Sequence, residues 1–194
     1  MNTPAHLIFG LTAFGKVGAK RVTAGALAGA IIPDLSLYLL AGWELIVKGT
    51  DANHVFGTMY YSESWQAIFR VDNSFVVWGI GLSFALMLRS GWAIALCGAA
   101  LLHLALDFPL HNDDARAHFW PVSNWKFVSP VSYWDGKYFG HIVGPLEIAA
   151  SVACCVLLWR RFQGLWMRIL IATLGAMELV PGIAFAIMFA GGSA

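Results

Sequence analysis

Histidine and aspartate side chains recur at spacings that would let them bind a divalent metal ion. His103 and Asp107 are four residues apart at the end of an apolar stretch, so on a helix they lie on one face, one turn apart. The pair could bind one metal ion, ligate two adjacent ions, or form a hydrogen bond inside a helix bundle. Because ionisable groups in apolar segments usually face a cavity or each other, we take the pair as the centre of a candidate site.

More ligand types follow in the segment after Pro109, which interrupts the helix. This segment carries His111, Asp113, Asp114 and His118. We expect both histidines to be metal ligands and Asp113 to be a solvated loop charge. Asp114 is a candidate general base.

Two other parts of the chain offer further candidates. His141 precedes a later apolar stretch and is expected to be a ligand, and Glu147 falls in the first turn of that stretch. Glu147 is either stabilised there by the helix dipole or acts as a ligand or general base. Near the N-terminus, His6 and Asp34 are polar residues in apolar surroundings. If the N-terminal segment packs against the bundle, both would join the cluster.

Imidazole and carboxylate ligands without thiolates suit zinc, and also manganese or iron. Such a metal ion makes water a nucleophile near neutral pH, and two ions would clamp a phosphoester. The sequence supplies enough ligands for two ions without requiring two. It contains no GxSxG elbow and no P-loop, so other hydrolytic templates fit poorly.

The segments that carry these residues are apolar enough for a membrane. Of the 194 residues, 59% are hydrophobic and 12% are charged, against about 25% charged in soluble domains. A span needs to cross about 30 Å of hydrocarbon. The sequence predicts an all-α, polytopic membrane bundle that forms a single domain over residues 1–194. Its expected spans are 22–47, 75–88, 92–108, 145–158 and 165–190, the second beginning somewhat earlier than 75, with a short re-entrant or interfacial helix over 4–14.

Charge placement predicts the orientation in the membrane. Basic residues gather in the short connections, and by the positive-inside rule that side is cytoplasmic. The long connections, 48–74 and 109–144, and the candidate site would then face the extracytoplasmic side, which we expect to be that of a bacterial inner membrane. The net charge of +1 gives no indication of a nucleic-acid partner, and the N-terminus lacks the basic start of a cleavable signal peptide. The basic residues are Lys16, Lys20, Arg21, Arg89, Arg160, Arg161 and Arg168.

Two features of the first span concern packing. Gly25 and Gly29 form a small-xxx-small spacing that allows a neighbouring helix to approach closely. Pro33, in the middle of the span, is expected to kink or break it.

The order of these motifs resembles the membrane-bound metal-dependent hydrolase family labelled LexA-regulated, which is distantly similar to zinc-dependent phospholipases C. The matching residues are His6 in an apolar segment, Pro33-Asp34, and His103-Leu-Ala-Leu-Asp107, followed by the stretch 118–123. The resemblance covers about residues 1–125 and implies hydrolysis without naming a substrate.

The chain departs from the family pattern at two positions. Ser36 stands where the family commonly has a second aspartate, and Asn73 stands where it often has a histidine. Either other residues compensate, or the site has lost activity. The compensating candidates are His111, His118, His141 and Glu147.

The leading hypothesis is a membrane-embedded, metal-dependent hydrolase that acts on a phosphoester or lipid-like substrate, with membrane lipid as its partner. The alternative is a non-catalytic accessory subunit of a membrane protein complex with a degenerate or structural metal site. A metal or proton carrier is a third hypothesis, but it requires polar groups through the inner halves of the spans, where few occur.

Overall fold

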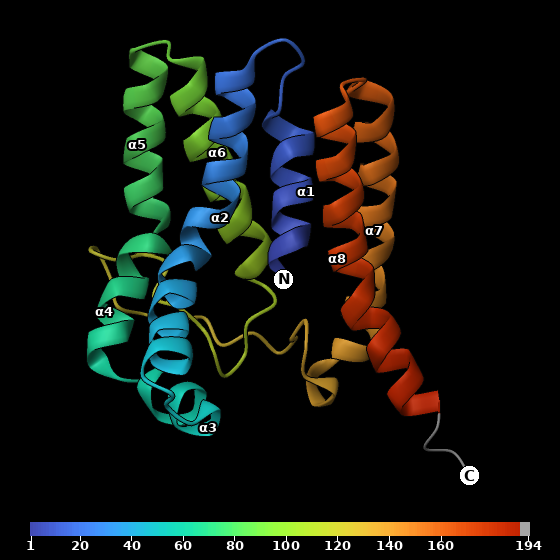
Figure 1. Ribbon diagram of the computed structural model, residues 1–194. Coiled ribbons are helices and arrows are strands. Elements are labelled where there is room, and N and C mark those ends of the chain that lie inside the picture. The colour runs from blue at the N-terminus through green and yellow to red at the C-terminus, as the bar shows by residue number, and fades with distance from the viewer. Residues whose placement is uncertain (191–194) are drawn as a thin grey trace.

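The computed structural model describes the backbone of residues 1–190 and the side chains of residues 1–180. All regular structure within residues 1–190 is helical, so the predicted all-α class is confirmed (Figure 1). The helices are α1 (Thr3–Phe14), α2 (Lys20–Gly42), α3 (Ala52–His54), α4 (Glu63–Asp72), α5 (Phe75–Met87), α6 (Gly91–Asp107), α7 (Gly140–Arg161) and α8 (Leu165–Ala190). A π-helical turn, Trp43–Val47, prolongs α2.

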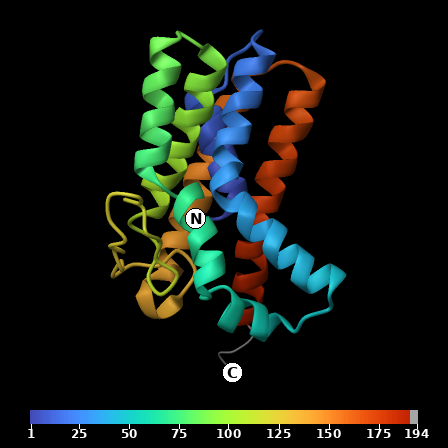
Figure 2. The ribbon, with the colours of Figure 1, turned by 90° about the vertical axis from the view of Figure 1, so that its left-hand side faces the viewer.

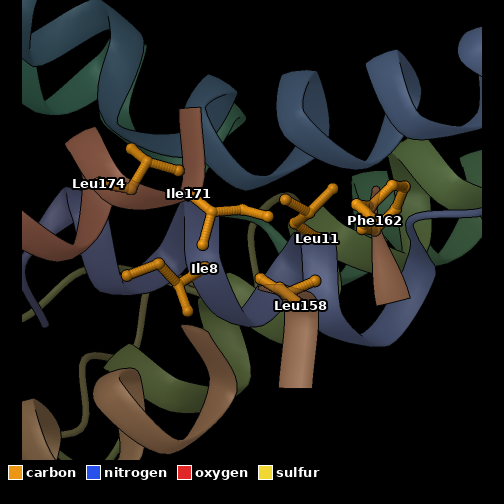
Figure 3. Packing of buried hydrophobic residues seen from close by; sticks show 6 residues of the cluster. All are labelled: Ile8, Leu11, Leu158, Phe162, Ile171 and Leu174. Carbon is orange, nitrogen blue, oxygen red and sulfur yellow. The ribbon is translucent and has the colours of Figure 1, made fainter. Parts of the chain in front are cut away.

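Helix α1 lies in the interior of the bundle formed by α2, α5, α6, α7 and α8 (Figures 1 and 2). It contacts α2, α6, α7 and α8. Its residues Ile8 and Leu11 are fully buried and pack against Leu158 of α7 and Ile171 of α8 (Figure 3). Neighbouring helices therefore cover α1 within the bundle. At about 1.5 Å per residue its 12 residues extend only about 18 Å.

The closest helix packing is between α2 and α6. A Cβ added to Gly29 would lie 1.9 Å from the carbonyl oxygen of Leu96, and one added to Gly25 would lie 2.6 Å from that of Trp92. The predicted close approach at the small-xxx-small spacing is thus confirmed. These contacts are with the N-terminal half of α6, and further along the same pair of helices His103 of α6 lies beside Ala30 of α2.

Pro33 lies inside α2 and does not end it. The helix axis changes direction in its second half (Figure 2). Because proline lacks an N–H, it removes one backbone hydrogen bond and favours a kink. Of the two expected effects, the structure has the kink and not the break.

Helix α5 begins at Phe75, so the expectation that it starts earlier is wrong. The Ser74 hydroxyl accepts a hydrogen bond from the N–H of Val77 (3.1 Å) and caps the helix. The preceding Asn73 links α2 to α4, since its side-chain amide donates to the carbonyls of Pro33 and Phe69 (3.1 Å each). The stretch before Asn73 forms the separate helix α4.

Within the part of the chain that the structure describes, two helices are long and apolar enough to cross a membrane. They are α2 with its π-helical turn, over Lys20–Val47, and α7, with mean hydropathies of 1.6 and 2.0. Helices α1 and α6 are apolar but shorter. Two of the five predicted spans therefore meet this criterion by length and composition among the described residues, and the side chains of residues 181–190 in the fifth predicted span lie outside them.

The basic connections lie together at one end of the bundle. The α1–α2, α5–α6 and α7–α8 connections are at the top of Figure 1, and segments 43–74 and 108–139 are at the opposite end. At the basic end, the Arg161 guanidinium donates to the carbonyls of Thr12 (2.9 Å) and Gly15. These bonds satisfy carbonyls at the C-terminus of α1 that have no partner within the helix.

Candidate metal centre

Three buried side chains converge where the start of α1 meets the end of α6. His6 comes from the first half of α1, and His103 and Asp107 come from the last turns of α6. Each offers one ligand atom, and these atoms all lie within 4.8 Å of one another. The group joins the N-terminal segment to the i, i+4 pair.

The separations between donor atoms suit a metal ion. Nε2 of His6 lies 2.9 Å from Oδ1 of Asp107, and Nε2 of His103 lies 3.2 Å from Oδ2 of the same carboxylate. Oδ1 of Asp34 lies 3.6 Å from Nε2 of His103. Tetrahedral zinc with ligands at 2.0–2.1 Å separates its ligand atoms by about 3.3 Å. The nitrogen of Met1 also lies 2.5 Å from Oδ1 of Asp107.

The orientation of His103 leaves one ring nitrogen facing the carboxylates. Its Nδ1 lies 2.8 Å from the carbonyl oxygen of Ala30, which can only accept, so Nδ1 carries a hydrogen. Nε2 is buried and makes no aligned hydrogen bond, although oxygens of Asp107 and Asp34 are close. In the neutral ring, Nε2 carries a lone pair that faces the negative oxygens of the two carboxylates. A cation between Nε2 and these oxygens would make the arrangement favourable. The donor set therefore fits a metal ion.

The two histidine rings are stacked face to face. The ring centroids of His6 and His103 are 3.5 Å apart, with an interplanar angle of 11°. Two imidazolium ions at this distance would repel each other, because a like charge disfavours the charged form. The stack disfavours the charging of both rings at once, and a neutral ring is the state that binds metals.

His111 extends the group from the segment after α6. Its Nε2 lies 3.3 Å from Oδ2 of Asp107, and its Nδ1 lies 2.8 Å from Oδ2 of Asp114. Burial alone would lower the pKa of His111, but the contacts with Asp107 and Asp114 outweigh it and raise the pKa. Burial would likewise raise the pKa of Asp114, but His111 outweighs it and the pKa falls. Asp114 thus holds His111 in place rather than standing free as a general base.

Asp34 is held beside the group by the start of α1. Its Oδ2 accepts a hydrogen bond from the Thr3 hydroxyl (2.7 Å), which also lies 2.5 Å from the Tyr38 hydroxyl. This contact orients the carboxylate toward His103. His6 and Asp34 were expected to join the cluster if the N-terminal segment packs against the bundle, and this segment does pack there.

Other candidates lie outside the group. The ring of His118 donates from Nδ1 to the Asn73 carbonyl (2.8 Å), and burial lowers its pKa to about 4, so it is a neutral structural histidine. His141 is exposed in the first turn of α7, with its Nδ1 3.3 Å from the Gly136 carbonyl oxygen. Glu147 is buried and accepts a hydrogen bond from the N–H of Asn2 (2.7 Å). Asp113 is exposed, as expected of a loop charge.

A cavity of about 120 Å³ opens beside the donor atoms. Asp34, Asp107 and His111 line it, but neither Asp114 nor Glu147 does. The expectation that one of these two carboxylates is a general base therefore has no support from the cavity. Sequence reasoning missed other lining residues, which are Thr3, Tyr38, Arg116 and Tyr133. Nothing in the sequence marks Arg116 or Tyr133 as part of the site.

Comparison of the chain with protein-family models, with curated proteins and with solved structures found no match.

Proposed function

We propose that this chain is a polytopic membrane protein. A helix that formed the core of a soluble protein would be mostly buried, yet only 17% of the apolar window of α7 and 33% of that of α2 are buried. Many large apolar side chains are exposed along the bundle, and extensive exposed apolar surface is typical of contact with a partner or a membrane. On α7 alone they are Ile142, Leu146, Val152, Val156, Leu157 and Trp159. In this proposal α5, α6 and α8 complete the five spans, and α1 is a re-entrant half-span.

The proposed orientation follows from the two ends of the bundle. The connections that carry the basic residues share one end, which the positive-inside rule assigns to the cytoplasm. The donor group lies toward the opposite end, where segments 43–74 and 108–139 cover the helices. The site would then open toward the extracytoplasmic face of a bacterial inner membrane.

The proposed activity is metal-dependent hydrolysis of a phosphoester. Its ligands are His6, His103 and Asp107, with Asp34 and His111 next to them. Zinc is the preferred ion for such donors, and manganese and iron also suit them. When bound, a metal ion of this kind acts as a Lewis acid and makes water a nucleophile near neutral pH. The observation that carries the proposal is the buried Nε2 of His103, which faces two carboxylates without a hydrogen bond.

A lipid-like substrate suits the surroundings of the cavity. Tyr38 lines the cavity and is half exposed, and Leu35 and Leu39 beside it are exposed on the outer face of α2. An acyl chain could lie along this face while a headgroup enters the cavity. The resemblance to membrane-bound metal-dependent hydrolases belongs to this proposal and agrees with it.

One observation favours the alternative of a non-catalytic accessory subunit with a structural metal. Asn73 stands where the family often has a histidine, and its side-chain amide donates hydrogen bonds to the carbonyls of Pro33 and Phe69. These bonds give it a structural role instead of that of a metal ligand. In this alternative the exposed end of the bundle would contact a larger membrane complex.

The test is phosphoester hydrolysis by the purified protein reconstituted in vesicles of bacterial phospholipids with added zinc. The hydrolase proposal expects release of a phosphorylated headgroup or of phosphate by the wild type. It expects none from Asp107→Ala, and full activity from the neighbouring-loop control Asp113→Ala. Bound zinc in the wild type without hydrolysis of any phosphoester lipid would favour the accessory subunit.

A further inference from the structure

Arg116 is a buried cation that the metal centre does not use. Only 6% of the residue is exposed, and it lines the same cavity as Asp34, Asp107 and His111. Among the described residues it makes no ion pair within 4.0 Å, and its Nη1 is buried without a hydrogen-bond partner. Burying an unpaired charge is costly, so an unpaired guanidinium at a cavity wall points to a ligand.

Aromatic rings fix the guanidinium in place. Its central carbon lies 4.3 Å from the ring centroid of Phe69 and 5.3 Å from that of Tyr60. Stacking on aromatic faces orients the planar group, while it leaves the N–H donors at its edge free. The arginine is thus held in one orientation while its Nη1 has no hydrogen-bond partner among the described residues.

The charges around the cavity make an anion the matching ligand. A divalent metal ion, together with the Met1 ammonium 2.5 Å from Oδ1 of Asp107, would balance the carboxylates of Asp34 and Asp107. Asp114 contacts His111 instead of Arg116. The guanidinium would then be the uncompensated charge at the cavity. Its fork of N–H donors matches the oxygens of phosphate in a bidentate manner. Tyr133 lines the same cavity, and its hydroxyl is a second donor for an anion.

We propose that Arg116 binds a phosphoryl oxyanion and positions it beside the metal centre, with Tyr133 as an additional donor. This inference rests on the proposed hydrolase function, for which it names the recognised group. A cavity needs only about 10–15 Å³ to hold one water, so about 120 Å³ accommodates a phosphoryl group but not a whole lipid. The acyl part of a lipid substrate would remain outside, on α2.

The test is calorimetric titration of the detergent-solubilised full-length chain with inorganic phosphate, both zinc-loaded and after removal of metal by a chelator. Arg116→Met keeps the apolar contact with Phe69 and removes the charge, and Arg116→Lys keeps the charge without the fork. Losing a charge-assisted hydrogen-bond pair should weaken phosphate binding by about tenfold or more in Arg116→Met, and by less in Arg116→Lys. Zinc content should be unchanged in both. The control Lys137→Met, at an exposed lysine in the same part of the chain, should bind phosphate like the wild type.

A second arm uses micelles of a short-chain phosphatidic acid, with the matching diacylglycerol as the uncharged reference. Equal dependence on Arg116 for phosphate and phosphatidic acid identifies the phosphoryl group itself, and dependence for phosphatidic acid alone identifies a lipid headgroup. Wild-type affinity in both Arg116 variants would overturn the inference, as would a wild type that binds neither ligand. If the wild type holds no zinc but its phosphate binding still depends on Arg116, the hydrolase proposal fails and the anion site stands.

Discussion

Neutralising Asp114 should weaken metal binding without unfolding the protein. Its Oδ2 lies 2.8 Å from Nδ1 of His111, whose other nitrogen lies 3.3 Å from Asp107. Asp114→Asn keeps the shape of the side chain and removes the charge that orients the imidazole and makes it a better donor. Loss of such a carboxylate typically costs 10–100-fold in metal affinity, so we expect a loss of about 1.4–2.7 kcal/mol.

The assay is competition for zinc between the detergent-solubilised protein and a chromogenic chelator of known affinity. Asp113→Asn is the matched control, because it removes the same charge from the adjacent residue, whose side chain is exposed. The expected result is an unchanged stoichiometry with a dissociation constant raised 10–100-fold in Asp114→Asn only. Equal affinities in the two variants would refute the reasoning, since the contact with His111 would then contribute nothing.

Three further predictions concern stability, measured by unfolding in detergent. Gly29→Ala should destabilise the protein by about 1–3 kcal/mol through overpacking, because its Cβ would lie 1.9 Å from a backbone oxygen of α6, whereas Gly42→Ala, with open space around it, should not. Arg161→Gln should cost about 1.5–3 kcal/mol by removing charged donors from two carbonyls at the end of α1, and the exposed neighbour variant Arg160→Gln should cost little. Burial lowers the pKa of His118 from 6.5 to about 4, so its neutral ring costs the folded state nothing above pH 6.5. As the pH falls from 6.5 toward 4, protonation in the unfolded chain increasingly favours unfolding. Acidification over this range should therefore destabilise the wild type by up to about 3 kcal/mol more than His118→Gln.

The helical class and the closest packing could be predicted from the sequence because both follow from local patterns. Apolar stretches predict helices, and the spacing of Gly25 and Gly29 predicts a close neighbour, which is α6. The interior position of α1 could not be predicted, since a 12-residue apolar helix fits an interface as well as a bundle interior. The start of α5 differs from the expectation because hydropathy does not register the cap by Ser74.

The core of the candidate site could be predicted because His103 and Asp107 are neighbours on one helix. Their meeting with His6 depends on how α1 packs, which the sequence indicates only as a condition. The roles of residues in the loop after α6 are harder to predict, because the direction in which each side chain points depends on tertiary contacts. His111 turns toward Asp107, whereas His118, seven residues later in the same segment, turns toward the Asn73 carbonyl.

Arg116 shows a further limit of sequence reasoning. A single arginine in a loop is usually a solvated charge, and nothing near it in the sequence indicates burial. It becomes a candidate only when Phe69 and Tyr60 are seen to cover its guanidinium.

The metal content of the purified protein tests the central claim most directly. Inductively coupled plasma mass spectrometry of the wild type should give about one or two zinc ions per chain, because the donors suffice for one or two. His103→Ala and Asp107→Ala should lose the metal, while Asp113→Ala should keep it. A folded wild type that holds no metal after zinc is supplied, or a His103→Ala variant that retains it in full, would contradict the account.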